Sequence, residues 1–116
     1  MSGLPPQQVL AILRIRQWMQ DRIALKTARA IDYERVGWKE RRRRQSDARI
    51  VRVIDFERAF QRLSHEEQTA LAGIYRDNLG QDVTAAAIGC SLRKLSYLLP
   101  IARQHLADIL DRLDLL

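Results

Sequence analysis

Residues 82–99, DVTAAAIGCSLRKLSYLL, contain two short helical stretches joined by a glycine-containing turn. The first stretch is rich in alanine, and Gly89 follows it as a residue that readily adopts the left-handed backbone that ends a helix. Ser91 comes two positions later and can cap a second helix with its hydroxyl. The small side chains of Ala85 and Ala86 let two helices approach closely. These features predict a helix-turn-helix.

The segment before this turn also carries helix signals. Ser64 and Glu67 have the spacing of a capping box, in which each side chain accepts a hydrogen bond from the other residue's backbone N–H, so a helix is predicted to start at His65. The following RDNLGQD is a turn by composition, in which Asn78 and Gly80 are expected to tolerate a positive φ.

Apolar residues recur at helical spacing in the first half of the chain as well. A long helix is predicted from about residue 6 to about residue 30. Its stripe is Ile12, Ile15, Trp18, Met19 and Ile23. A second helix is predicted from its cap at Asp47 to near Leu63. Its stripe is Ile50, Val53, Phe56, Phe60 and Leu63. Because no segment alternates as a strand does, we predict an all-α helical bundle with a long N-terminal helix and a C-terminal helix-turn-helix. We expect an N-terminal unit over residues 1–46 and a helix-turn-helix module over residues 47–116.

Positive charge gathers in the first half of the chain. The formal net charge is +6, and residues 1–50 hold 12 Lys or Arg against 5 Asp or Glu, whereas residues 51–116 hold 8 against 9. The densest cluster is WKERRRRQ, residues 38–45, where four consecutive arginines should repel one another, so a loop or frayed helix is predicted over residues 33–45. Three interpretations stay open for this cluster: a solvated segment, a contact with nucleic-acid phosphates, or a contact with an acidic protein. The arginines are Arg41, Arg42, Arg43 and Arg44.

The segment FQRLSHEEQTALAGIYRDNLGQDVTAAAIGCSLRKLSYLLPIARQHL resembles region 4 of bacterial sigma factors over about residues 56–110. That pattern has a leucine before a capped helix, a glycine-containing turn, an alanine-centred short helix, a glycine, apolar residue and serine turn, and a recognition helix. The residues on matching positions are Leu63, Ala85, Ile88, Gly89, Cys90, Ser91, Leu95, Ala102 and Leu106. Two positions depart from it, because Thr84 stands where the family usually has an apolar residue and Val83 where it usually has Glu. The order of an N-terminal helical extension, a basic segment and this module is also similar to phage late-gene transcription activators.

Pro100 falls in the middle of the proposed recognition helix. It removes the N–H that would bond the Ser96 carbonyl, at a cost of about 3 kcal/mol in an unbroken helix. We therefore predict a kink or break near Leu99, with a short recognition helix over residues 92–99 and a closing helix over residues 100–115.

Helix geometry then selects the residues expected to meet DNA. With Leu95, Leu98 and Leu99 directed inward, the outward residues of the first turns reach base edges in the major groove. These outward residues are Arg93, Lys94 and Tyr97, flanked by Leu92 and Ser96. Gln81 and Thr84 are expected to contact phosphates from the preceding helix. The alternative is that all of them are ordinary exposed polar residues.

The charge balance of the C-terminal half does not favour DNA binding. Residues 64–116 hold 5 Lys or Arg against 7 Asp or Glu, which is unfavourable against a polyanion. Much of the electrostatic affinity for DNA is therefore expected from the arginines in the first half of the chain.

Other chemistry is sparse in the sequence. Cys90 is expected to be a packed thiol, and His65 and His105 to have surface roles without metal-ligand spacing. No cofactor, no metal and no enzymatic activity are predicted. No apolar run is long enough to cross a membrane and no signal peptide is apparent, so a cytoplasmic protein is expected.

The sequence thus predicts a transcription regulator, with a phage origin suggested by the resemblance. Double-stranded DNA is the expected partner of the helix-turn-helix, and RNA polymerase or a second copy of the chain, giving a homodimer, is the expected partner of the N-terminal helix. Two alternatives stay open: an inhibitor or adaptor that binds a polymerase subunit or sigma factor without DNA, and a viral packaging protein that recognises a genome end.

Overall fold

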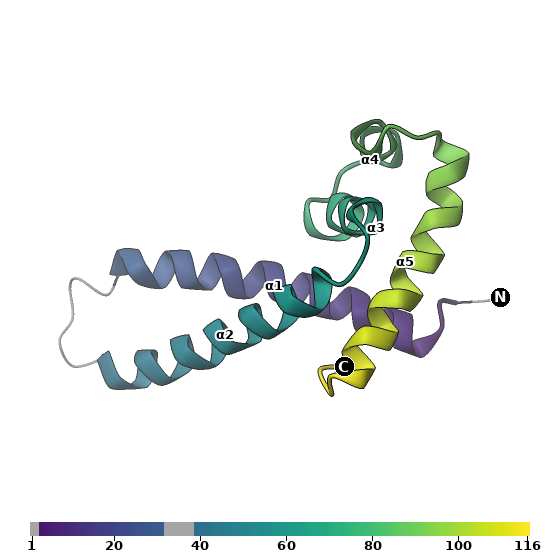
Figure 1. Ribbon diagram of the computed structural model, residues 1–116. Coiled ribbons are helices and arrows are strands. Elements are labelled where there is room, and N and C mark those ends of the chain that lie inside the picture. The colour runs from purple at the N-terminus through teal and green to yellow at the C-terminus, as the bar shows by residue number, and fades with distance from the viewer. Residues whose placement is uncertain (1–2, 32–38) are drawn as a thin grey trace.

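The computed structural model describes the backbone of residues 3–31 and 39–116 and the side chains of residues 3–26 and 48–116. Within these residues all regular secondary structure is helical, which confirms the all-α class (Figure 1). The elements in chain order are α1 (Pro6–Ile31), α2 (Lys39–Phe60), α3 (His65–Leu71), the π-helical turn η2 (Ala72–Arg76), α4 (Gln81–Ile88) and α5 (Leu92–Arg112).

Helices α1 and α2 run antiparallel as a long hairpin (Figure 1). The indole of Trp18 on α1 packs against the rings of Phe56 and Phe60 on α2, with centroid separations of 5.0 and 5.3 Å. The predicted N-terminal helix is confirmed, but the second helix begins at Lys39, so Asp47 lies inside α2 and is not its cap.

Of the two alternatives predicted over residues 33–45, a loop or a frayed helix, the loop is wrong for residues 39–45, which are helical. Residues 33–38 lie outside the described part of the chain. Arginine is among the better helix formers, and repulsion between exposed like charges is weakened by solvent and salt. The helix propensity of arginine therefore outweighs the repulsion between like charges in this segment.

One hydrophobic core joins the hairpin to the rest of the chain. Ile15 of α1, Leu71 of α3 and Leu106 of α5 are all fully buried within it. Helix α1 contacts α2, α5 and η2. The core therefore contains residues from both sides of position 46, and that position itself lies inside α2.

Helix α5 is continuous through Pro100, so the predicted break near Leu99 is wrong. Both Pro100 and Ser96 are exposed, and water can therefore bond the Ser96 carbonyl that the proline leaves without a donor. A single buried stripe runs along both halves of the helix. Its members are Leu95, Leu99, Ala102, Leu106, Ala107 and Leu110. Burial of that stripe stabilises one long helix more than the proline destabilises it.

The connection between α2 and α4 follows the predicted signals in part. Ser64 and Glu67 form the capping box at the start of α3, with both reciprocal hydrogen bonds at 3.2 Å. Asn78 has the expected positive φ of 52°, but Gly80 has a φ of −65° and is the N-cap of α4. The turn therefore needs left-handed backbone at Asn78 only.

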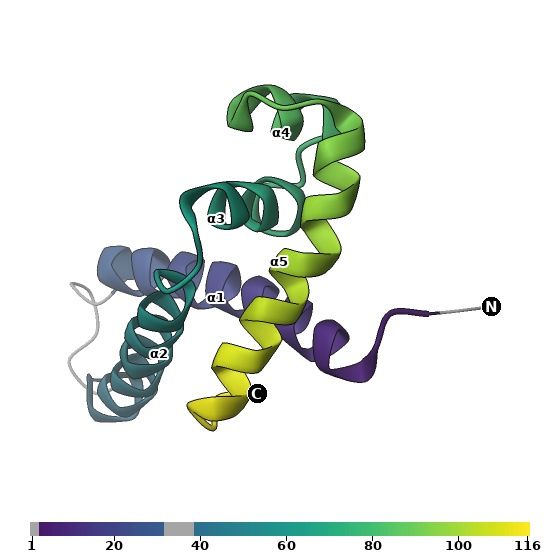
Figure 2. The same cartoon turned by 45° about the vertical axis from the view of Figure 1, so that its right-hand side comes forward.

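The molecule is elongated, with dimensions of 54 × 29 × 28 Å and a radius of gyration of 16.5 Å. A compact domain of this length would have a radius of gyration of about 13 Å. Figures 1 and 2 show the reason, because the α1–α2 hairpin extends to one side while α3, α4 and the first half of α5 lie at the other.

Candidate nucleic-acid interface

The turn between α4 and α5 is fixed by hydrogen bonds at both of its ends. Gly89 has a φ of 81°, and its N–H bonds the carbonyls of Ala85 and Ala86 at 2.9 and 3.1 Å. The Ser91 hydroxyl accepts a hydrogen bond of 3.1 Å from the backbone N–H of Lys94. The predicted helix end at Gly89 and the predicted cap at Ser91 are both confirmed. These hydrogen bonds within the turn therefore fix the direction of α5 relative to α4.

The first turns of α5 present a group of exposed side chains. This group consists of Leu92, Arg93, Lys94, Ser96 and Tyr97. Tyr97 is 63% exposed and Leu92 is 52% exposed. Leu95, by contrast, is fully buried on the opposite side of the helix, and Leu98 is half-buried. The structure thus brings together all five α5 residues that the sequence assigned to DNA contact.

The two cations of this group, Arg93 and Lys94, have at most one weak ion pair with the described side chains. Lys94 Nζ lies 3.9 Å from a carboxylate oxygen of Glu66, and both side chains are more than half exposed. Such a pair contributes between about 0 and 1 kcal/mol. No described side chain pairs with the guanidinium of Arg93, although its backbone carbonyl accepts a 2.7 Å bond from the Ser96 hydroxyl. Both cations are therefore available to an anionic partner.

Thr84 is fully buried, so its expected contact with a phosphate is wrong. Its hydroxyl donates to the Gly80 carbonyl at 2.9 Å. Helix α4 packs so closely on η2 that a Cβ on Gly73 would lie 2.8 Å from two side-chain atoms of Thr84. The sequence carried a signal of this burial, because Thr84 occupies a position at which the similar family has an apolar residue. Gln81, in the first turn of α4, is exposed as expected.

The four consecutive arginines lie far from the α4–α5 turn. Residues 41–44 belong to the first turns of α2, and Figures 1 and 2 place the start of α2 at the opposite end of the molecule from α4. Their side chains lie outside the described residues. The structure therefore does not bring Arg41, Arg42, Arg43 and Arg44 together with the exposed residues of α5.

Sequence reasoning missed the polar contacts that fix α1 to its neighbours. Arg103 of α5 donates to Gln8 of α1 at 3.0 Å and to the Tyr75 hydroxyl of η2 at 2.9 Å. This arginine therefore links three elements. No spacing in the chain could indicate such a contact, because its partners lie 95 and 28 positions away.

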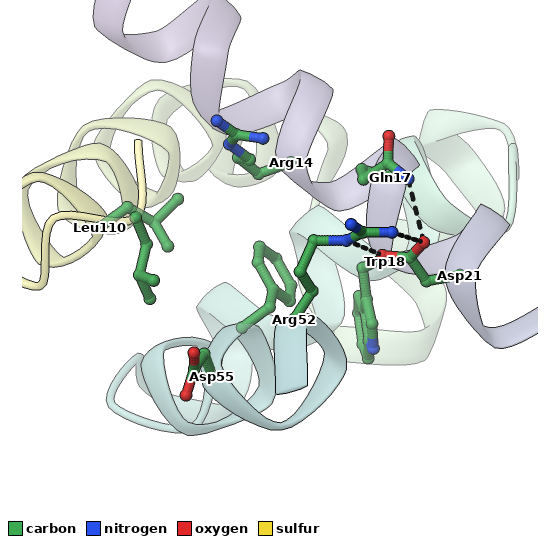
Figure 3. A pocket seen from close by; sticks show the side chains of 9 residues that line it. Arg14, Gln17, Trp18, Asp21, Arg52, Asp55 and Leu110 are labelled. Atoms are coloured by element: carbon green, nitrogen blue, oxygen red, sulfur yellow. Dashed lines mark hydrogen bonds and ion pairs between the residues drawn. The ribbon is translucent and has the colours of Figure 1, made fainter. Parts of the chain in front are cut away.

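An ion pair between Asp21 and Arg52 joins α1 to α2 (Figure 3). The guanidinium donates to both carboxylate oxygens, at 2.8 and 3.0 Å, and Gln17 adds a bond of 3.1 Å. Burial by itself raises the pKa of Asp21, but the hydrogen bonds from Arg52 and Gln17 outweigh it and hold the pKa below its usual value. Beside the pair lies a small cavity of about 80 Å³ with Trp18, Phe56 and Leu110 in its wall.

The other titratable candidates have packing or surface positions. Cys90 is half-buried against the core, as expected. His105 is exposed at the surface but lies 2.6 Å from a carboxylate oxygen of the buried Glu67. Among the described residues no group of three His, Cys, Asp or Glu side chains is placed to hold a metal ion.

No protein-family model matches the sequence, and neither a curated protein nor a solved structure is significantly similar to it. None of the helices in the described residues combines the length and apolar character of a membrane span. The likeness to sigma factor region 4 thus rests on the residues of this chain alone.

Proposed function

We propose that this protein is a DNA-binding transcription regulator in which α4 and α5 act as a helix-turn-helix. The observation that carries the proposal is the exposed group Leu92, Arg93, Lys94, Ser96 and Tyr97 on the first turns of α5. Leu95 and Leu99 are buried on the opposite face of α5 and pack it against the core, and Ser91 caps its first turn. A rigid helix with a polar outer surface and a free cation suits the major groove.

The side chains of this surface have distinct expected roles. Arg93 is suited to a bidentate contact with guanine O6 and N7, which contributes about 1–3 kcal/mol of discrimination against a wrong base. Lys94 and Gln81 are suited to phosphates, and Leu92 to a thymine methyl group. Arg93 thus carries the sequence preference in this proposal.

The arginines of residues 41–44 are expected to contact phosphates away from the base-reading surface, because their helix turns lie at the other end of the molecule. Their contribution to affinity would be independent of sequence and would fall steeply with salt. In this arrangement α5 selects the site, and the hairpin adds affinity and holds RNA polymerase nearby.

A second candidate function is an adaptor that binds a polymerase subunit or sigma factor without DNA. It is favoured by the apolar side chains exposed on α5, because Leu92, Tyr97 and Ile101 are 52–63% exposed. The net acidic balance of residues 64–116 points the same way. A viral packaging role would use the same DNA surface and differ from transcription only in the target sequence.

Selection of duplexes from a random pool on the purified chain would supply a specific site, and titrations would then compare that site with a scrambled duplex. We expect Arg93→Ala to reduce the ratio of specific to scrambled affinity by about 5- to 150-fold. Arg42→Ala should weaken both duplexes alike. Arg112→Ala, in the last turn of α5, is the matched control and should change neither.

Equal losses on both duplexes for Arg93→Ala would refute base reading by this residue. Failure of the intact chain to bind any duplex, together with binding to RNA polymerase, would replace the proposal with the adaptor function.

A further inference from the structure

The first half of α1 has a second apolar surface besides the one buried in the core. Ala11, Ile15 and Trp18 face the core and are at most 6% exposed. Val9, Leu10 and Leu13 lie on the opposite side and are 41, 42 and 50% exposed. In Figure 2 the purple first turns of α1 emerge beyond α5. This outer surface therefore has no partner within the described chain.

Leu10, Leu13 and Gln20 are exposed and follow the spacing of a coiled-coil seam, and Gln17 between them is half-buried and donates to Asp21. Leu10, Leu13, Gln17 and Gln20 are separated by three, four and three positions, which is the alternation of the a and d positions of a heptad. On a helix that turns about 100° per residue, Arg14 and Arg16 then fall on the two sides of this seam, at its e and g positions. We call Leu10, Leu13, Gln17 and Gln20, with Arg14 and Arg16 beside them, the outer seam of α1.

The charged side chains of residues 3–20 have one sign only, although Arg14 lines the same pocket as Asp21, Arg52 and Asp55. Residues 3–20 contain Arg14 and Arg16 and no Asp or Glu. Both arginines are exposed, and no described side chain forms an ion pair with either of them. Charges at e and g positions decide which helix pairs with which, because like charges across the seam repel and opposite charges attract.

We propose that the outer seam of α1 binds an acidic amphipathic helix of a partner protein in a short coiled-coil contact. The partner helix would place leucine-like side chains against Leu10 and Leu13 and carboxylates against Arg14 and Arg16. A second copy of this chain fits poorly, because pairing two outer seams in either orientation sets arginine against arginine. DNA fits poorly as well, because its phosphates would leave the exposed leucines unpaired. This inference does not depend on DNA binding by α5.

Peptide binding to the full-length protein tests the proposal. The probe is a fluorescein-labelled 21-residue peptide with Leu at its a and d positions and Glu at its e and g positions, and the matched control peptide has Lys in place of those Glu. We expect fluorescence anisotropy to show binding of the Glu peptide only. The affinity of the Glu peptide should fall as the salt concentration rises, because the contacts between its Glu side chains and the two arginines are exposed to solvent.

Two double variants locate the contact. Arg14→Glu with Arg16→Glu should weaken the Glu peptide by about tenfold or more and create binding of the Lys peptide. Leu10→Ser with Leu13→Ser should abolish binding, while the melting temperature stays close to that of the parent because both side chains point outward. Arg58→Glu, an exposed arginine on α2, is the matched control and should keep the preference for the Glu peptide.

Equal binding of the Glu and Lys peptides would overturn the proposal, as would a charge reversal that leaves the preference unchanged. Sedimentation velocity provides a further check. A dimer of the parent protein that Leu10→Ser with Leu13→Ser converts to monomer would assign the outer seam to a second copy. Co-sedimentation with vesicles of 30% phosphatidylserine, lost in the same variant, would assign it to an anionic membrane.

Discussion

The carboxylate of Glu67 is buried and links the start of α3 to α5. One oxygen accepts a hydrogen bond from the backbone N–H of Ser64, and the other lies 2.6 Å from the ring of His105 on α5. Burial alone would raise the pKa of Glu67, but the Ser64 N–H and hydroxyl and His105 hold that pKa below its usual value. The charged form of Glu67 therefore stabilises the folded state.

The stability of the protein should depend on pH through Glu67. Because its pKa is lower in the folded than in the unfolded chain, the stabilisation is present above the unfolded value of about 4.3 and is lost as the pH falls through the folded pKa. We expect Glu67→Gln to reduce the free energy of unfolding by about 1–3 kcal/mol at pH 7. The difference should shrink as the pH falls through the lowered folded pKa and the parent carboxyl takes up a proton.

Urea unfolding of the two proteins between pH 3 and 7 would measure this effect, with Glu66→Gln as the control that removes an exposed charge from the same turn. A difference between parent and Glu67→Gln that stays constant over this range would contradict the assigned role. Both variants should keep some acid sensitivity, because the pKa of Asp21 is lowered as well.

At the scale of single residues, the sequence revealed the contacts that are local in the chain. The capping box of Ser64 and Glu67 is visible because its partners are three positions apart. The contact of Glu67 with His105 spans 38 positions and depends on how α3 packs against α5, which no spacing encodes. Thr84 was expected to contact a phosphate because it lies near the start of the helix before the turn. Its side chain is buried instead, and its hydroxyl bonds the Gly80 carbonyl, so burial costs little.

Helix α5 shows how packing decides the continuity of an element. Local chemistry at Pro100 argues for a break, but the buried stripe from Leu95 to Leu110 continues on both sides of it. The missing hydrogen bond falls on the solvent side of the helix, where water can substitute. Tertiary burial therefore overrides a strong local signal in this helix.

Replacing the proline should stabilise the element. We expect Pro100→Ala to raise the free energy of unfolding by about 1–3 kcal/mol, because it restores the bond to the Ser96 carbonyl and removes no buried surface. Chemical denaturation would measure the change. Ile101→Ala, at the neighbouring exposed position, is the control for general effects of alanine at this turn. A loss of stability in Pro100→Ala would mean that the proline fixes a geometry that the fold requires.

Helix boundaries were predictable where a capping residue marks the start or the end of the helix. Ser64, Gly89 and Ser91 mark three ends correctly, because each satisfies backbone groups that a helix end leaves open. The start of α2 was missed because repulsion within residues 41–44 was given more weight than helix propensity. The end of α1 at Ile31 agrees with the loss of its apolar stripe near residue 30.

At the scale of the whole molecule, α1 acts as part of the core. Its buried residues Ala11, Ile15 and Trp18 contact elements that lie more than 30 positions away in the chain. The sequence predicted the helix and its apolar stripe. It left open whether that stripe covers the other helices or binds a partner, because periodicity shows which face is apolar but not what covers it.

A chain that begins at Asp47 should fail to fold. Loss of each large core side chain costs about 2–5 kcal/mol, and the total stability of a domain is about 5–15 kcal/mol. Circular dichroism on heating should show a cooperative transition for the intact chain and none for the shortened one. A chain that begins at Pro5 is the control, because it loses no residue of the core. A cooperative transition in the shortened chain would show that α1 is dispensable for folding.

The extended α1–α2 hairpin also determines how the molecule tumbles in solution. A body of 54 × 29 × 28 Å rotates faster about its long axis than end over end. Backbone N–H bonds lie nearly parallel to the axis of their helix, and in Figure 1 α1 and α2 follow the long dimension while α5 crosses it. Amide nitrogens in the hairpin should therefore show larger ratios of transverse to longitudinal relaxation rates than those in α5. Rotational anisotropy would thus report the orientation of the hairpin in 15N-enriched protein without a bound ligand or an attached probe.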